Sequence, residues 1–220
     1  MIEFFGVELR HGARVILSGL SGQVETGSLT ALIGPNGSGK TTLLRAIAGL
    51  HPLARGRIDI GGLKAADIAL LAQGSHLDRS FPITVRDVVA LAATRLGPFR
   101  SIGKDRLAAT RAALQRVGLA EMESRPIQAL SAGQFQRVLF ARTIVQDARL
   151  ILLDEPFTAV DAATTRLLLS VIQDWHAQGR TVIAVLHDID LVRRHFPHTL
   201  LLTGQSGSWD ALPNPGLQAA

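Results

Sequence analysis

A glycine-rich segment places the strongest constraint on how this chain can fold. Residues 34–41 have the sequence GPNGSGKT, which matches the pattern G-x-x-x-x-G-K-[ST] at every fixed position. An apolar run at residues 29–33 precedes it, and a run with helical character at residues 42–50 follows it. Glycines let such a loop bend so that its N–H groups point inward, and the following helix adds its positive N-terminal end. The segment therefore predicts a strand, a phosphate-binding loop and a helix.

This loop supplies candidate residues for binding the phosphates of a nucleoside triphosphate. Lys40 can reach the outer phosphates, and the Thr41 hydroxyl can ligate Mg²⁺. A chance glycine turn before a helix is the alternative, but the flanking runs match the motif as well as the loop does. The candidate residues are Gly34, Pro35, Asn36, Gly37, Ser38, Gly39, Lys40, Thr41 and Thr42.

The sequence LILLDE at residues 150–155 predicts a buried strand that ends in two adjacent carboxylates. Neighbouring side chains in a strand point to opposite faces, but a turn at the end of the strand can present both. Beside a phosphate-binding loop, Asp154 can support Mg²⁺ and Glu155 can polarise an attacking water. Taken alone, the stretch could also be a strand that ends in two solvated acids.

The alternation of strand and helix patterns indicates a parallel sheet with a mostly helical insert. Strands are expected within residues 2–33 and at 57–60, 68–72, 150–153, 181–186 and 200–202. Helices are expected at residues 131–145, with Ser131 as N-cap, and at 162–177 and 189–195. We predict a single domain of 220 residues, with a core at 1–75 and 131–205, a helical subdomain at 76–130 and a loose tail at 206–220.

Composition narrows the class of protein further. The chain is 47% hydrophobic, yet its apolar stretches fall far short of the ~18 residues that a membrane-spanning helix needs. It has no cysteine, which excludes disulfides and cysteine-based zinc sites and is compatible with the cytoplasm. The net charge is +5, but the arginines are scattered. Ordinary solvated faces explain most of these arginines, so no nucleic-acid partner is expected.

Two further motifs complete a set of four in a fixed order. LSAGQ occupies residues 130–134, and His187 follows the strand TVIAVL. With the phosphate loop and LILLDE, they make the chain resemble the ATP-binding subunit of an ABC transporter over nearly its whole length. LSAGQ stands where that family carries its LSGGQ signature. The resemblance implies an α/β fold with a P-loop NTPase core, an N-terminal antiparallel β subdomain, a helical insert, and ATP and Mg²⁺ as ligands.

The resemblance also implies that two such subunits pair head to tail around two ATP molecules. The signature residues of one chain, Ser131, Ala132, Gly133 and Gln134, would then close over the ATP of the other, and Asp161 would reach across the pair. Ala132 departs from the usual glycine of the family. Its methyl group is acceptable if this residue has a helical φ, which we expect.

Three more residues take their expected roles from the resemblance. Gln73 matches the Q-loop glutamine, whose amide can contact Mg²⁺ or the attacking water, and His187 matches the switch histidine, which orients that water. His11 stands where the family has an aromatic residue that stacks on adenine. Histidine can also stack, but a solvated loop histidine is the open alternative.

The expected partners follow from the same resemblance. A chain without membrane segments requires a separate permease, and the chain itself is expected at the cytoplasmic face of the plasma (inner) membrane. A solute-binding protein is expected to act indirectly, through the same transporter. Residues 76–89, HLDRSFPITVRDVV, are expected to contact the permease. SFPITVRDVV and DEPFTAVD are similar to the branch that imports manganese, zinc or iron.

Two other classes of protein are alternatives to a transport ATPase. Soluble ABC-type ATPases that act on ribosomes or DNA usually carry two ATPase halves or a long coiled-coil insert, and this chain has neither. A P-loop kinase or GTPase would account for residues 34–41 but not for LSAGQ ahead of LILLDEP.

Overall fold

The computed structural model describes residues 1–72, 81–93 and 104–210, which fall into two units. The first unit comprises Met1–Gln73, Leu150–Pro156 and Trp175–Ala220, and the second comprises Gly74–Arg149 and Phe157–Asp174. The helical subdomain expected at residues 76–130 is therefore only part of the second unit. That unit also includes α4 (Ala132–Gln146) and most of α5 (Ala162–Ala177), because α4 contacts the preceding helices of the insert.

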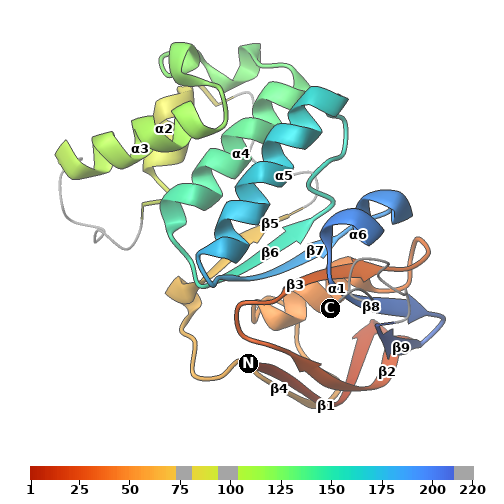
Figure 1. Cartoon of the computed structure of the whole chain (residues 1–220). Coiled ribbons are helices and arrows are strands. Elements are labelled where there is room, and N and C mark those ends of the chain that lie inside the picture. Colours follow the sequence, from red (N-terminus) through yellow and green to blue (C-terminus); the bar gives the residue numbers. More distant parts are fainter. Residues whose placement is uncertain (73–80, 94–103, 211–220) are drawn as a thin grey trace. The chain divides into compact units, whose positions relative to one another are not determined.

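A six-stranded sheet forms the centre of the first unit (Figure 1). Its strand order is β5-β6-β7-β3-β8-β9, and every pair is parallel except β8 with β9. All five residues of β3, β6 and β7 are buried, as the continuous aliphatic runs predict for central strands of a parallel sheet. The strands are β3 (Leu29–Ile33), β5 (Ile68–Leu71), β6 (Leu150–Asp154), β7 (Thr181–Val185), β8 (His198–Thr203) and β9 (Ser206–Trp209).

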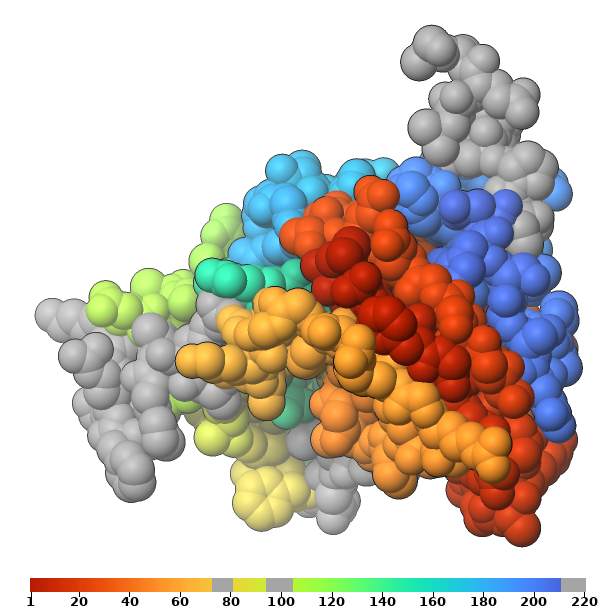
Figure 2. Space-filling model, turned by 90° about the horizontal axis from the view of Figure 1, so that it is seen from below, coloured from red at the N-terminus to blue at the C-terminus, as the bar shows by residue number. Residues whose placement is uncertain are grey.

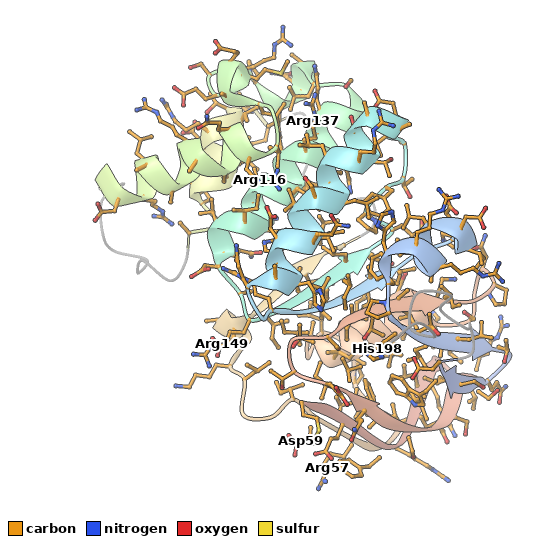
Figure 3. The ribbon with its side chains drawn as sticks, in the orientation of Figure 1. Arg57, Asp59, Arg116, Arg137, Arg149 and His198 are labelled. Carbon is orange, nitrogen blue, oxygen red and sulfur yellow. The ribbon has the colours of Figure 1, made fainter. Side chains whose placement is uncertain are left out.

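The expected antiparallel β subdomain is a three-stranded sheet in the same unit. It contains β1 (Ile2–His11), β2 (Arg14–Val24) and β4 (Arg55–Asp59) in the order β2-β1-β4. Figure 2 shows its surface from below, with the N-terminal residues in red beside the orange segment that contains β4. Arg57 and Asp59 project from β4 in Figure 3, and the Arg57 guanidinium lies 4.3 Å from the centroid of the Phe5 ring.

One buried cluster joins both sheets to α1 (Lys40–Ile47) and fixes that helix in the first unit. Leu43 and Leu44 of α1 are fully buried in this cluster. The small sheet contributes Phe4 and Leu9 among others, and the large sheet contributes Leu152. Because this apolar packing leaves α1 little freedom, the start of the helix has a defined position at the end of β3.

The second unit is helical. It contains α2 (Val85–Ala90) and α3 (Lys104–Arg116) in addition to α4 and α5, and α2, α3 and α4 contact one another. Arg116, labelled in Figure 3, donates from Nε to Asp174 Oδ2 over 3.0 Å and from a terminal nitrogen to the Ser170 hydroxyl over 3.1 Å, which ties α3 to α5. Short 3₁₀ turns lie at Ala120–Met122 and Ile127–Ala129.

The first unit has two further short helical segments, a 3₁₀ turn at Ala65–Asp67 and α6 (Ile189–His195). Asp188 caps α6 by accepting from the N–H groups of Asp190 and Leu191, both over 3.0 Å. Across the described ranges of both units, no helix has the length and apolar character needed to span a membrane.

The expectation of a loose tail from residue 206 needs correction at its start. Residues 206–209 form β9, which pairs with β8, and the Asp210 N–H donates to Thr199 O over 2.7 Å. A side chain on Gly207 would lie 2.7 Å from Leu20 Cδ1, so the glycine that suggested a loose segment allows close packing instead. Residues 211–220 lie outside the described part of the chain.

Trp209 should contribute measurably to stability, because it attaches this last strand to the small sheet. Its ring lies 5.7 Å from the Phe4 ring, and its Nε1 donates to Ser21 O over 2.8 Å. We expect Trp209→Ala to lower the free energy of unfolding by about 2 to 4 kcal/mol, measured by denaturant titration. Trp209→Phe should recover most of the loss. A Trp209→Ala chain as stable as the parent would show that the strand is only loosely attached.

Candidate functional site

The phosphate loop follows a backbone path that suits glycine. It joins β3 to α1, and Gly34, Gly37 and Gly39 have φ angles of 146°, 79° and 95°. A side chain at Gly34 would lie 2.3 Å from the carbonyl oxygen of Leu202, so no other residue fits there. Gly39 is the N-cap of α1 and offers no side-chain acceptor, and the first turn of the helix contains no acidic residue. The first N–H groups of α1 are thus suited to an anion.

The Lys40 ammonium is held by the loop itself. Its Nζ donates to the carbonyl oxygens of Gly34 and Pro35 over 2.8 Å and 2.9 Å, and the residue is buried. Burial lowers the pKa of Lys40, and the negative charges of Glu155 and Asp154 oppose that shift. These contacts fix a positive charge at the loop, where phosphate oxygens would otherwise repel one another.

Thr41 and Asp154 form an oxygen pair suited to a hard cation. The Thr41 hydroxyl donates to Asp154 Oδ1 over 3.1 Å, and Asp154 is buried at the end of β6. In the parts of the chain that the structure describes, no group of three or more His, Asp or Glu side chains could hold a metal ion. Two oxygen atoms of this kind fit Mg²⁺, which typically takes one or two protein oxygens together with water and substrate phosphates.

Glu155 turns the chain directly after β6. Its φ is 50°, in the left-handed region, which costs a residue other than glycine about 1 to 2 kcal/mol. This turn lets two adjacent carboxylates serve one site: Asp154 bonds Thr41, while Glu155 Oε1 lies 2.8 Å from His187 Nε2. The carboxylate can only accept, so Nε2 carries the proton of this hydrogen bond. The Glu155 side chain is 18% exposed and that of His187 is 45% exposed.

A cavity of about 620 Å³ brings these groups together within the first unit. Its volume lies within the usual range for ligand sites. Of the expected loop residues, Gly34, Pro35 and Ser38 do not line it. The lining residues are Ile16, Asn36, Gly37, Gly39, Lys40, Thr41, Thr42, Glu155 and His187.

The Ser38 hydroxyl is buried in the loop and has no hydrogen-bond partner among the described residues. A buried polar group without a partner costs free energy, so this atom favours a ligand oxygen or a water nearby. The Ser38 hydroxyl is therefore consistent with a loop that surrounds a phosphate group.

His11 ends β1 opposite Arg14, is exposed, and is not among the residues that line the cavity. Ile16, on the same hairpin, does line it. Ile16 was not predicted as a site residue, because it lies in an ordinary strand pattern. No local signal shows that this strand passes the phosphate loop, where a side chain at Gly39 would meet Ile16 Cγ2 at 2.5 Å. A role for His11 in adenine stacking stays a prediction.

The signature residues belong to the second unit and begin α4. Ser131 is the N-cap, and it forms a reciprocal capping box with Gln134. Ala132 opens the helix and is not among the residues with positive φ, which confirms the expected helical φ. A side chain at Gly133 would make only ordinary contacts, 3.8 Å from Ala159 O and Val160 Cγ1. The fold of this unit therefore does not itself require glycine at 133.

Asp161 lies in the same unit and accepts from the Thr164 N–H over 2.7 Å at the start of α5. Hydrogen bonds from Thr164 are the main cause that lowers the pKa of Asp161, and the positive charge of Arg137 adds to the effect. Gln73 lies outside the described residues.

The chain is similar to known proteins of one family over most of its length. The model of the ABC transporter family matches residues 17–158, which is more than half of the chain. The zinc transport system ATP-binding protein TroB of Treponema pallidum is 39% identical over 199 residues, which are 88% of this chain and 75% of that protein. The manganese transport system ATP-binding protein MntB of Bacillus subtilis is 37% identical over 206 residues, 91% of this chain and 82% of that protein.

A solved structure has the same fold. It is a dimeric, post-hydrolysis state of the ATP-binding cassette MJ0796 bound to ADP and Pi, with a TM-score of 0.83 and 23% identity over 97% of this chain and 99% of that one. The chain therefore belongs to the ABC transporter family, as an ATP-binding subunit with ATPase activity.

Proposed function

We propose that this chain hydrolyses ATP in a head-to-tail pair with a second copy and thereby drives the import of a metal ion through a separate permease. The main support for ATP hydrolysis is a single cavity, which is lined by residues of the phosphate loop, Thr41, Glu155 and His187. Positioning and neutralisation of charge are what phosphoryl transfer chiefly requires. These residues can supply both.

The binding roles follow from the contacts of the first unit. Lys40 and the N–H groups at the start of α1 would hold the phosphates, with the ammonium already oriented by Gly34 O and Pro35 O. Thr41 and Asp154 would hold Mg²⁺. When bound, this ion would neutralise charge on the phosphates. We expect the Ser38 hydroxyl to find its hydrogen-bond partner in the loaded site.

The catalytic roles rest on the pair formed by Glu155 and His187. The oxygen of a water would attack the γ-phosphorus as the bond to the bridging oxygen of ADP breaks, and Glu155 would accept the proton of that water. His187 donates to Glu155 Oε1, so it can fix the direction of the carboxylate and of the water beside it. Gln73, which lies outside the described residues, is proposed to contact Mg²⁺ or the water.

The second copy would complete the site. Ser131, Gly133 and the start of α4 would approach the γ-phosphate held by the other chain, since a helix N-terminus favours an anion. We further propose that Asp161 reaches across the pair. ATP would hold the two chains together, and hydrolysis would let them part.

The cargo and the remaining partners are inferred from the relatives. The similar proteins TroB and MntB are named for zinc and manganese transport, so a divalent metal ion is the proposed cargo. A membrane permease, contacted by the region around residues 76–89, and a solute-binding protein would complete the transporter, and this chain would lie at the cytoplasmic face of the inner membrane. Residues 76–80 of that region lie outside the described part.

Glu155→Gln should separate binding from catalysis. Its amide keeps the shape of the side chain but cannot take a proton, so we expect the ATPase rate to fall by about 10² to 10⁴-fold. ATP affinity should change by less than about threefold, because the phosphate contacts remain. Phosphate release and calorimetric titration with a non-hydrolysable analogue measure the two quantities. Glu121→Gln, at an exposed position of the second unit, is the matched control. Near-normal turnover in Glu155→Gln would remove Glu155 from the role of base.

Gly133→Ala should weaken ATP-dependent pairing without harming the fold. The chain itself accepts a methyl group at this position, and alanine favours a helix, so stability should change by less than about 1 kcal/mol. The added methyl group would force the neighbouring phosphate, held by the other chain, to move away. We therefore expect Gly133→Ala, introduced into the Glu155→Gln chain, to weaken pairing about tenfold. Sedimentation velocity with ATP and Mg²⁺ measures the dimer. Undiminished pairing would contradict the role of Gly133, and a Glu155→Gln chain with Gly133 intact that stays monomeric with ATP would contradict the head-to-tail pair.

Metal uptake by cells should depend on catalysis by this chain. In cells that lack the gene, we expect uptake of radioactive manganese or zinc to be restored by the parent chain and not by Glu155→Gln. Uptake of a sugar serves as the control and should be the same in all strains. Equal metal uptake with both chains would exclude manganese and zinc as cargo.

A further inference from the structure

The hairpin of β1 and β2 reaches the nucleotide cavity. His11 and Arg14 face each other across a two-residue turn, and Ile16 follows on β2. Ile16 is the lining residue that comes from this hairpin, while the others come from the phosphate loop, the start of α1 and the ends of β6 and β7. Its Cγ2 atom fills the space where a side chain at Gly39 would lie, at 2.5 Å. The position of this hairpin therefore shapes one wall of the cavity.

The segment that follows α1 is attached to the same hairpin. His51 Nε2 lies 3.1 Å from Arg10 O, one residue before His11. Three residues later, the Ala54 N–H donates to Glu8 O over 2.9 Å. Pairing between β1 and β2 shifts register between Leu9 and Arg10, so His51 binds β1 where its ladder is irregular. Figure 2 shows the red N-terminal strand and the orange segment side by side, in agreement with the pairing of β1 and β4.

The hydrogen bond from His51 to the Arg10 carbonyl, called the tether below, can form in two states of the imidazole ring. A backbone carbonyl only accepts hydrogen bonds, so Nε2 of His51 must carry a proton. Both the Nε2–H neutral tautomer and the imidazolium meet that requirement. Since α1 begins at Lys40 and ends at Ile47, His51 links the hairpin tip to the chain just beyond the helix that helps to hold the phosphates.

We propose that His51 is a positioning residue for the base end of the nucleotide, which acts by holding the β1–β2 hairpin, and with it Ile16, against the cavity. The inference rests on the proposed function, in which the loop and α1 bind the triphosphate. The nucleoside then extends beyond the loop, where Ile16 offers an apolar surface to a base. His51 touches neither the phosphates nor the water in this arrangement, so its effect is confined to affinity.

Comparison of a nucleotide with its phosphate chain alone tests this assignment. We expect His51→Ala to weaken binding of a non-hydrolysable ATP analogue about threefold to tenfold, the effect of losing one hydrogen bond. Binding of inorganic tripolyphosphate, which has no base, should change by less than about twofold. The KM for ATP should rise by the same factor as the loss of affinity for the analogue, with kcat nearly unchanged. Competition against a fluorescent nucleotide gives both affinities.

A conservative variant and a distant histidine serve as controls. His51→Gln retains an N–H donor that can reach the Arg10 carbonyl, so it should restore the affinity for the analogue. His176→Ala, at an exposed position near the end of α5, should leave both ligands unaffected.

Three results would overturn the inference. Equal weakening of both ligands by His51→Ala would mean that His51 supports the phosphate loop or the whole fold. An unchanged affinity for the analogue would mean that the tether has no role in binding. A parent chain that binds neither ligand would overturn the proposed function together with this inference.

Discussion

The nucleotide site depends on a loop whose backbone lies so close to its neighbours that a side chain would not fit at two of its positions. Gly34 lies against the carbonyl of Leu202 in β8, and Gly39 lies against Ile16 of β2. The loop is therefore packed between a strand of each sheet, and its left-handed φ angles suit glycine. This packing brings the Gly34 and Pro35 carbonyls to the Lys40 ammonium and opens the start of α1 toward the cavity.

The parallel order of the strands brings the other site residues together. β6, β7 and β3 are neighbours and run in the same direction, so the residues that follow them meet at one edge of the sheet. Asp154 thus meets Thr41 across 113 positions of sequence, and His187 meets Glu155 across 32. The left-handed φ of Glu155 costs conformational free energy at this end of the sheet. Without this turn, the two adjacent carboxylates would point to opposite faces.

The parts of the fold that could be predicted are those with strong local patterns. The bounds of α5 and α6 agree with the predicted helices, and the aliphatic runs before the loop and before Asp154 are buried central strands. The tail was predicted less well, because Ser and Gly at 206–208 suggest a loop until the partner strand is known. Likewise, α4 was predicted from the sequence, but its membership of the second unit was not, because that depends on contacts with α2 and α3.

By itself, the sequence determined the chemical groups and the local conformations: the glycines of the loop, the Ser131 cap, and the two acids at the end of β6. These features depend on interactions within a few residues, so they can be predicted from a short stretch of the sequence. Only the tertiary structure decided that Ile16 lines the cavity, that His187 bonds Glu155 and that Trp209 packs on Phe4. Such contacts join residues far apart in the chain, and their partners are selected by the burial of apolar surface over a whole unit rather than by any local preference.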